Sequence, residues 1–398
     1  MRKYRTAVLA VILAMAVIFV TGCTTFDNFK ETFFHAKGVE TDTIKIGVLE
    51  PQTGNDSKSG ELEIRGIELA RELAPEVLGK EVELVYADTQ SSIYTAETAV
   101  ADLIDKKPAI VLGSYGEAVS LTASQQLGAV GIPAISITST NSLITENNEY
   151  YFRVTFSDAS QGNALAQYTV DKLKQNTAAV VRIKDDDTTS DMISKFSSRM
   201  KALTESENAI AASINLDLDQ KDYTDSIEKL KASKARTVFL AVPIATAEEF
   251  FQAVEDAGLQ GYTFLGTKEW HGEELIELQA KFPKISIAVA ADFTGTMTSD
   301  TDKTDRYEEF LKAYEAKYGA EEPEEATALA FDAYMIAVKA IETAGDTDGE
   351  KVKDALKQTT NFSGASGEIS FDESGNPKKT INIDVIKDNQ VVSVYTVH

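Results

Sequence analysis

The sequence contains very little cysteine and histidine, and this limits the chemistry that it can carry. Cys23 is the only cysteine among 398 residues, which excludes an intramolecular disulfide and a cysteine-based metal site. The three histidines, His35, His271 and His398, are far apart in the chain, so no histidine cluster indicates a metal centre. We therefore expect neither a metal site nor a cofactor.

Short motifs of common enzyme classes are also missing. The chain has no Gly-x-Ser-x-Gly elbow, no phosphate-binding lysine loop and no Gly-x-Gly-x-x-Gly fingerprint. Its many carboxylates could include an acid–base pair, but a charged, solvated surface explains them more simply. The sequence therefore favours a protein that is not an enzyme.

Positive charge is scarce as well. The chain has 39 Lys and Arg against 63 Asp and Glu, a formal net charge of −24. Such a surface repels nucleic acid and anionic lipid headgroups, and no basic DNA-reading headpiece is present. We expect no nucleic-acid partner.

The N-terminus has the features of an export signal. Arg2, Lys3 and Arg5 precede an uncharged run that ends at Val20-Thr21-Gly22-Cys23, which is typical of a signal peptide with a lipobox. We interpret residues 1–22 as the signal peptide and 23–42 as a tether with lipid on Cys23, which anchors an extracytoplasmic protein to the bacterial cell membrane. An uncleaved transmembrane anchor is the alternative, although the run is short for a span of about 20 residues.

From residue 44 onward, short apolar strands alternate with helical patterns. Ile64, Ile67, Ala70 and Leu73 recur at helical spacing, and Asp158 with Gln161 has the spacing of a capping box before a second helix. The strands are expected at 44–49, 82–87, 109–112, 132–137, 178–183, 237–242 and 285–293, with a hairpin around Asp388-Asn389. This alternation predicts an α/β protein with parallel sheets covered on both faces, in two halves.

Landmarks along nearly the whole mature chain resemble one family, the type I periplasmic binding proteins of the branched-chain amino acid and amide uptake group. The resemblance rests on their order and spacing. They are Ile46-Gly47-Val48-Leu49 with Pro51 and Thr53-Gly54, Arg65 to Ala70, Asp88, Gly113, Tyr151-Phe152-Arg153, Asp158-x-x-Gln161-Gly162, Tyr223-Thr224-Asp225, Phe331 to Tyr334, and Gly364 to Asp372.

The resemblance implies two Rossmann-like lobes with parallel sheets, joined by three hinge crossovers that close on a ligand. The crossovers are expected near 153–158, 288–293 and 359–367. The N-terminal lobe would comprise 43–156 plus 292–358, and the C-terminal lobe 157–291 plus 359–398.

The function implied is that of a monomeric substrate-binding lipoprotein. It would capture a small ligand, an amino acid or a related amide, and deliver it to the transmembrane permease subunits of an ABC importer. A ligand-sensing receptor coupled to a signalling partner would use the same fold and the same closure.

In the first lobe, two segments are candidates for ligand binding, because ligands of parallel α/β sheets lie beyond the carboxyl ends of the strands. Tyr115, Gly116 and Glu117 follow a strand and open a helix, whose free amides suit a carboxylate; a plain strand-to-helix turn is the alternative. The family usually has a small hydroxyl residue where Glu117 aligns. An acid there would either cap the helix or repel a ligand carboxylate.

The second segment comprises Thr138, Ser139 and Thr140, which resemble the family's segment that presents backbone and hydroxyl groups to an amino acid. Hydroxyls and amides can satisfy a carboxylate that has left water. Local turns of a Ser/Thr loop are the alternative. We favour ligand binding here, with Ser139 and Thr140 foremost.

The second lobe departs from the family's pattern. Thr188 and Val242 occupy ligand-side positions where relatives often carry an aromatic-glycine pair and a glycine or tyrosine. In the segment that resembles Gly-x-acid-Gly-Trp, Lys268 aligns with the acid, and Glu269 takes that role if the loop shifts by one. Trp270 could form an apolar or cation-binding wall, or pack between the lobes.

Overall fold

The computed structural model describes residues 43–295 and 303–398. The predicted signal peptide, Cys23 and the tether lie outside these described residues. Within them, no helix has both the length and the apolar character needed to cross a membrane.

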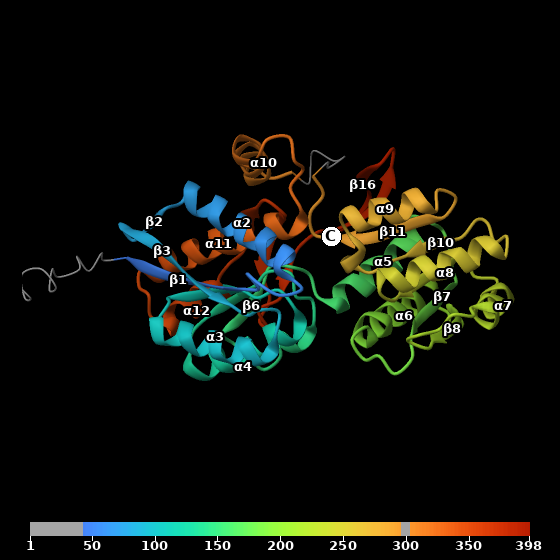
Figure 1. Cartoon of the computed structure of the whole chain (residues 1–398), viewed down its shortest axis with the longest axis horizontal. Helices are drawn as coiled ribbons and strands as arrows, with labels where there is room; N and C mark the ends of the chain where they lie inside the picture. The colour runs from blue at the N-terminus through green and yellow to red at the C-terminus, as the bar shows by residue number, and fades with distance from the viewer. Residues whose placement is uncertain (1–42, 296–302) are drawn as a thin grey trace, which may run out of the picture. The chain divides into compact units, whose positions relative to one another are not determined.

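The first sheet has the strand order β2-β3-β1-β4-β5-β6 and lies on the left of Figure 1. All its neighbouring strands are parallel except β2 and β3, which form an antiparallel pair. The strands are β1 (Ile44–Glu50), β2 (Glu76–Val77), β3 (Lys80–Asp88), β4 (Ile110–Gly113), β5 (Ala134–Ser136) and β6 (Tyr151–Arg153).

Helices cover both faces of this sheet because its central strands are apolar on both sides. In β4, Ile110 and Leu112 pack with one set of helices, whereas Val111 faces the opposite set. The first set is α2 (Ser57–Leu73), α10 (Asp305–Tyr318), α11 (Glu325–Ala344) and α12 (Gly349–Lys357); the second is α3 (Ile93–Lys106), α4 (Glu117–Val130) and the short 3-10 helix η1 (Ser142–Ile144).

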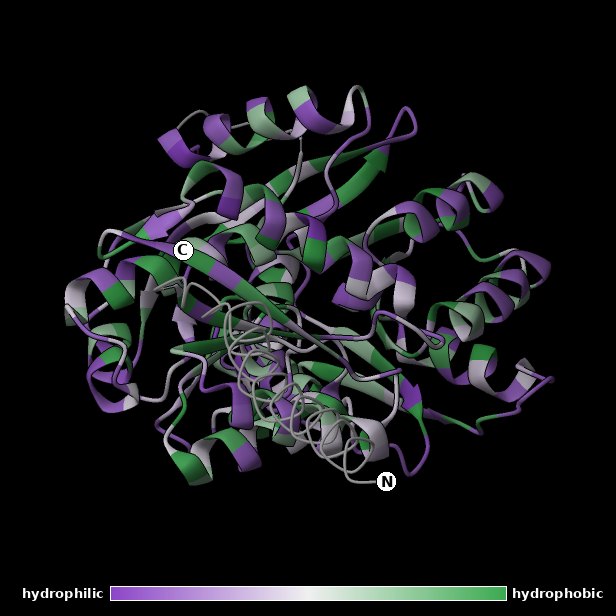
Figure 2. Ribbon diagram, turned by 60° about the vertical axis from the view of Figure 1, so that its left-hand side comes forward, coloured by the Kyte–Doolittle hydropathy of each residue, from purple (hydrophilic) through white to green (hydrophobic). Residues whose placement is uncertain are grey.

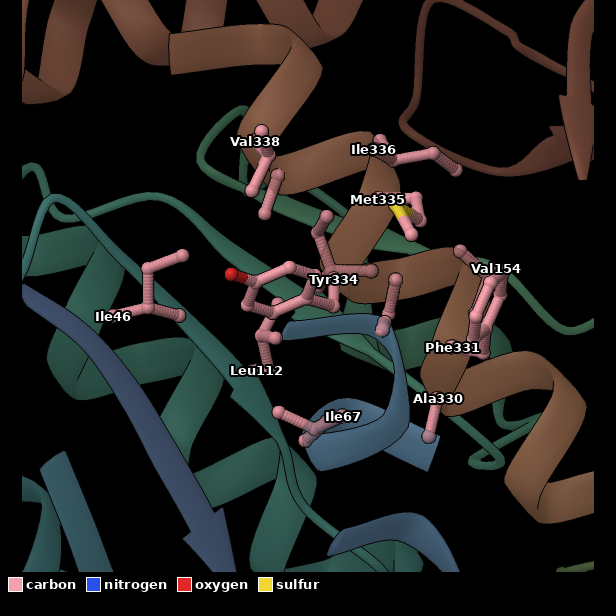
Figure 3. Close-up of a cluster of buried hydrophobic side chains, with 14 of the residues drawn as sticks. Ile46, Ile67, Leu112, Val154, Ala330, Phe331, Tyr334, Met335, Ile336 and Val338 are labelled. Atoms are coloured by element: carbon pink, nitrogen blue, oxygen red, sulfur yellow. The ribbon is translucent and has the colours of Figure 1, made fainter. Parts of the chain in front are cut away.

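The longest of these helices, α11, supplies much of the first core. Phe331, Tyr334 and Met335 of α11 lie in the same buried cluster as Ile67 of α2 and Leu112 of β4 (Figure 3). Burying a large side chain of this kind is worth about 1.5–3 kcal/mol, so α11 must fold back onto the N-terminal sheet despite the long intervening chain.

The second sheet has the order β16-β15-β11-β10-β9-β7-β8. Its members from β8 to β11 are parallel, and β15 and β16 add an antiparallel hairpin at the edge. The strands are β7 (Ala178–Ile183), β8 (Ile210–Leu216), β9 (Thr237–Ala241), β10 (Thr263–Leu265), β11 (Ser286–Ala291), β15 (Ile381–Lys387) and β16 (Gln390–Val397).

The second sheet is also buried on both faces. In β9, Val238 and Leu240 contact one core, and Phe239 contacts the other. The covering helices are α5 (Asp158–Asp171), α6 (Ser190–Thr204), α7 (Thr224–Ser233), α8 (Ile244–Asp256) and α9 (Glu273–Lys281), with a 3-10 helix η2 (Lys268–Trp270) after β10. Along the outer helices, hydrophobic and hydrophilic residues alternate, as Figure 2 shows. The expected α/β fold with two parallel-dominated sheets is confirmed.

Local details follow the sequence with one exception. The hairpin between β15 and β16 turns at Asp388 and Asn389, which have φ values of 51° and 62°, as its short polar loop predicts. The expected capping box of Asp158 and Gln161 is wrong, because the hydroxyl of Ser157 caps α5 by accepting a hydrogen bond from the amide of Ser160.

A small third sheet shifts the last crossover. It consists of β12 (Phe362–Gly364), β13 (Gly367–Phe371) and β14 (Pro377–Lys378), and Ala365, Ile369 and Phe371 are buried in the first core. The chain therefore joins the second sheet only at β15, so residues 362–378 pack with the first lobe, not with the second lobe as the boundary at 359 implied.

Candidate ligand-binding site

A cavity of about 270 Å³ is lined by residues from both lobes. Its position is beyond β4 and β5 of the first sheet and beyond β10 of the second, where parallel α/β sheets place ligands. The residues that line it are Leu62, Tyr115, Gly116, Glu117, Thr138, Ser139, Lys268, Glu269, His271, Glu324, Glu325 and Ala326.

The turn after β4 brings Tyr115 and Gly116 to the cavity. Gly113 ends β4 with φ 110°, and a β-carbon there would lie 2.2 Å from the carbonyl oxygen of Leu49, so only glycine fits. Beyond it, the amide of Tyr115 donates a 3.0 Å hydrogen bond to Oε2 of Glu50. A buried acid at the end of β1 thus fixes this turn.

Ser139 uses its hydroxyl inside the protein. Its Oγ donates to the carbonyl oxygen of Ser114 at 3.3 Å and lies 2.8 Å from Oγ of Ser120. The side chain is 3% exposed. Ser139 therefore ties its loop to the β4 turn, and this polar contact is not directed at a ligand.

Glu117 takes hydrogen bonds from the loop across the cavity mouth. Its Oε1 accepts from the amide of Thr140 at 2.8 Å, and its Oε2 accepts from the amide of Asn141 at 3.0 Å. Desolvation by the surrounding protein raises the pKa of Glu117, although these two amides and the charge of Arg153 act in the opposite direction. Thr140 itself does not line the cavity.

Arg153 holds the same loop from behind. Its fully buried guanidinium donates to the carbonyl oxygens of Ser139 and Asn141 and to the hydroxyl of Thr145. Burial lowers the pKa of Arg153 to about 10. Because this value is still well above 7, the side chain remains charged at neutral pH. The loop from 139 to 141 is thus fixed by an arginine on one side and a glutamate on the other.

On the second lobe, η2 orients Lys268 and Glu269 differently. Lys268 is buried, and its Nζ lies 2.6 Å from Asp292 and 2.9 Å from Glu325. Glu269 is exposed and lines the cavity. The structure therefore directs the carboxylate of Glu269, and not a free ammonium of Lys268, to the open space.

A sequence comparison identifies the family. The chain matches the periplasmic binding protein family over residues 43–388. It belongs to that family. One curated relative, Leu/Ile/Val-binding protein homolog 1 of Brucella abortus (strain 2308), is 26% identical over 343 residues, which cover 84% of this chain and 88% of the relative.

Solved structures of binding proteins have the same fold. The leucine binding protein LivK of Thermotoga maritima superposes with a TM-score of 0.77 and 26% identity, covering 89% of this chain and 99% of that one. A solute binding protein of an ABC transporter from R. palustris, in complex with benzoate, gives a TM-score of 0.71 at 19% identity, covering 89% and 96%. The latter likeness concerns the fold alone.

Within this periplasmic binding protein, three further residues expected at the ligand, besides Thr140, do not line the cavity. Trp270 is fully buried in the core that also contains Val238 and Leu240, and its ring lies edge-on to Phe251. Its indole N–H donates to the carbonyl oxygen of Val242 at 2.9 Å. Val242 is buried in that core too. Thr188 is exposed and hydrogen-bonds only to Asp186 in its own turn among the described residues.

Other expected residues do meet at the cavity. Tyr115, Gly116, Glu117, Thr138, Ser139 and Glu269 all line it. The lining residues that the sequence did not single out are Leu62 of α2, His271 after η2, and Glu324 to Ala326 at the start of α11. Pro323 followed by Glu324 and Glu325 marks a helix N-terminus in the sequence. In a chain this rich in acidic residues, these two did not stand out as candidates for the site.

Two acids lie behind the cavity wall. Glu50 and Glu63 are both fully buried, and Glu63 accepts a hydrogen bond from the hydroxyl of Thr138. Burial raises the pKa of Glu63 to about 7, and burial together with the charge of Glu63 raises the pKa of Glu50 well above its usual value. Through their hydrogen bonds to the Tyr115 amide and the Thr138 hydroxyl, the two acids support the segments that carry these residues.

A larger hollow of about 670 Å³ lies on the second lobe alone, along α7 and α8. Its rim is charged and it receives nothing from the first sheet. Because closure of two lobes on a ligand needs contacts from both, the smaller cavity is the better candidate site.

Proposed function

We propose that this chain is an extracytoplasmic solute-binding lipoprotein of an ABC importer. It captures one small organic solute between its two lobes, closes around it, and delivers it to the transmembrane permease subunits. The observation that carries the proposal is the cavity lined from both lobes, with Tyr115 and Glu117 on one side and Glu269 on the other. A ligand that contacts both sides favours the closed population by its differential affinity.

The crossovers support hinge closure. Thr155 on the first crossover and Lys379 on the third both contact Asp292 on the second, at 2.6 Å and 2.7 Å. Next to this centre, the buried Lys268 of the second lobe also pairs with Glu325 of the first. Farther away, contacts between the lobes are exposed or partly exposed, as for Ser142 with Asp191 and for Lys58 with Glu273. A fixed axis with weak contacts around it permits opening, since exposed ion pairs contribute only about 0–1 kcal/mol.

The ligand we propose is a small organic solute of the size of an amino acid or a related amide. The volume of about 270 Å³ suits a molecule of that size. The curated relative from Brucella abortus carries the name of a Leu/Ile/Val-binding protein, and LivK of Thermotoga maritima that of a leucine binding protein. The polar and acidic lining of this chain supports a hydrogen-bonding solute.

Membrane attachment is proposed through lipid on Cys23. We expect Cys23→Ala to abolish lipid attachment while the protein still folds. Metabolic labelling with a fatty acid in the producing cells tests this, with the wild-type chain as the positive control. Lipid that remains on the variant would contradict the lipobox interpretation.

A thermal-shift screen against amino acids, amides, amines and small carboxylates tests solute capture. A ligand at 100 times its Kd stabilises the folded state by about 2.7 kcal/mol, a large effect in such a screen. The same compounds are then recovered and analysed, because a binding protein returns its ligand unchanged. Absence of stabilisation by any compound of any charge, or chemical turnover of the stabilising compound, would overturn the proposal.

A further inference from the structure

The strongest unexplained feature of the site is that Glu117 occupies two backbone donors of the 139–141 loop, the segment expected to hold a ligand carboxylate. The amides of Thr140 and Asn141 are already bonded to its two oxygens, at 2.8 Å and 3.0 Å. Each backbone N–H offers one proton. A second carboxylate at this place would lack its donors and would lie against a like charge, which discriminates strongly against it.

The cations near the cavity are already neutralised by other groups. Lys268 pairs with Asp292 and Glu325, and Lys379 pairs with Asp292. Arg153 is bonded to carbonyl oxygens behind the loop, where its charge partly offsets Glu117. None of these groups is available to pair with an anion.

The remaining group that can carry a positive charge is His271, which lines the cavity. Its Nε2 lies 3.1 Å from Oδ2 of Asp384, a fully buried carboxylate. The histidine therefore already has an acidic partner. A ligand anion in the cavity would compete with Asp384 for it.

Two cavity carboxylates have no directly bonded partner. Among residues 43–295 and 303–398, the carboxylates of Glu269 and Glu324 have neither a hydrogen bond nor an ion pair, although the charges of His271 and Lys58 act on Glu324. The charge of Glu269 contributes to the raised pKa values of Glu117 and Asp158. Glu269 therefore lies close enough to both acids to repel their negative charges. The cavity therefore has an excess of negative charge contributed by both lobes.

The lining also indicates an organic cation. The ring of the half-buried Tyr115 and the apolar side chains of Leu62 and Ala326 share the cavity with the acids. An aromatic face and apolar surface favour a cation that carries a hydrocarbon part. No group of three or more His, Cys, Asp or Glu side chains that could hold a metal ion occurs in the described part of the chain.

We propose that the ligand is a small organic cation, an ammonium compound without a free carboxylate, which on closure contacts Glu269 of the second lobe together with Glu117 and Glu324 of the first. This rests on the proposed function, because it names the ligand class of the same cavity. A zwitterionic amino acid and an anionic carboxylate are the competing ligand classes.

The test is a charge series with constant shape. Calorimetry on the full chain in detergent, at about pH 6.5, keeps an α-amine of pKa about 8 protonated. The probes are leucinamide, 3-methylbutylamine, leucine and 4-methylpentanoate, with the corresponding alanine and phenylalanine series for other ligand sizes. We expect a cation of one series to bind about tenfold or more tighter than its zwitterion and its carboxylate.

Variants connect the result to the named residues. Glu269→Gln is expected to weaken cation binding about tenfold, whereas Glu277→Gln, an exposed acid of α9 away from the cavity, leaves it unchanged. Glu117→Ser frees the amides of Thr140 and Asn141 and is expected to strengthen leucine binding. Thermal melts of all three variants establish that they are folded.

Equal or tighter binding of leucine or a carboxylate by the wild-type chain would overturn the inference, and so would the absence of binding by every cation in the three series. In either case the proposed function remains standing if some anionic or neutral solute stabilises the protein. It falls if no compound of any charge does, or if the stabilising compound is turned over. The two failures are therefore distinguishable.

Discussion

Lys379 Nζ lies 2.7 Å from Oδ1 of Asp292, and this buried pair joins the third crossover to the second. The other oxygen of Asp292 accepts from Lys268 and from the hydroxyl of Thr155 on the first crossover. One carboxylate thus contacts all three connections between the lobes. Lys268 is the first residue of η2, and the next residue of that helix, Glu269, lines the cavity.

We expect Asp292→Asn to destabilise the protein strongly. The change leaves two buried ammonium groups with one carboxylate, Glu325, and removing one partner of a buried pair typically costs about 3–5 kcal/mol. Urea unfolding measured by far-UV circular dichroism gives the loss. Asp219→Asn, at an exposed site, provides the same charge change as a control.

A loss of less than about 1 kcal/mol for Asp292→Asn, similar to that of an exposed pair, would contradict this account of the hinge centre.

Stability is expected to increase as the pH falls from about 8 to about 5. Burial raises the pKa values of Glu63 and Asp158 to about 7, above their usual values of 4.5 and 3.8. A raised carboxyl pKa means that the folded state binds the proton more tightly, so this stabilisation is present below the ordinary pKa and is lost as the pH rises through 7. The pKa of His271, also raised, acts in the same direction.

Between about pH 5 and 6.5 the slope should be on the order of 2–3 kcal/mol per pH unit, which corresponds to about two extra protons bound by the folded state. Denaturant midpoints across the pH range measure it. Glu63→Gln keeps the shape and removes one titration, so the variant should show a smaller slope. An unchanged slope in Glu63→Gln would assign the pH dependence to other groups.

Trp270→Phe is expected to reduce stability and to leave ligand affinity nearly unchanged. The substitution removes the hydrogen bond to Val242 and part of the edge-on contact with Phe251. The expected loss in the free energy of unfolding is about 1–3 kcal/mol. Thermal unfolding and calorimetry with the best-binding compound separate the two effects. A normal melt with affinity lost by more than about tenfold would restore tryptophan as a wall of the site.

The fold was largely predictable because its signals are local. Strands such as β7, Ala178–Ile183, and β9, Thr237–Ala241, are short apolar runs that stand out between helical patterns. The hairpin at Asp388-Asn389 is specified by its turn residues. The segment of β12 and β13 was assigned to the second lobe because its apolar residues can cover either core, and only long-range packing decides between them.

The first-lobe site was predicted better than the second-lobe site for a related reason. Tyr115, Glu117 and Thr138 directly follow strands, so their place at the sheet's edge is set by topology. Trp270 and Val242 also follow strands, but their apolar side chains bury themselves in the nearest core. Glu324 and Glu325 come from a helix start far along the chain, and no local pattern marks such a residue as part of this cavity.

Hydrogen–deuterium exchange tests capture between the lobes most directly. The compound that stabilises the protein most in the thermal-shift screen is added at saturation, and peptides covering 113–118 of the first lobe and 266–272 of the second are followed together. The account predicts that both become protected at the same ligand concentration, because one molecule contacts both sides of the cavity. Protection confined to one lobe, or to the hollow along α7 and α8, would contradict it.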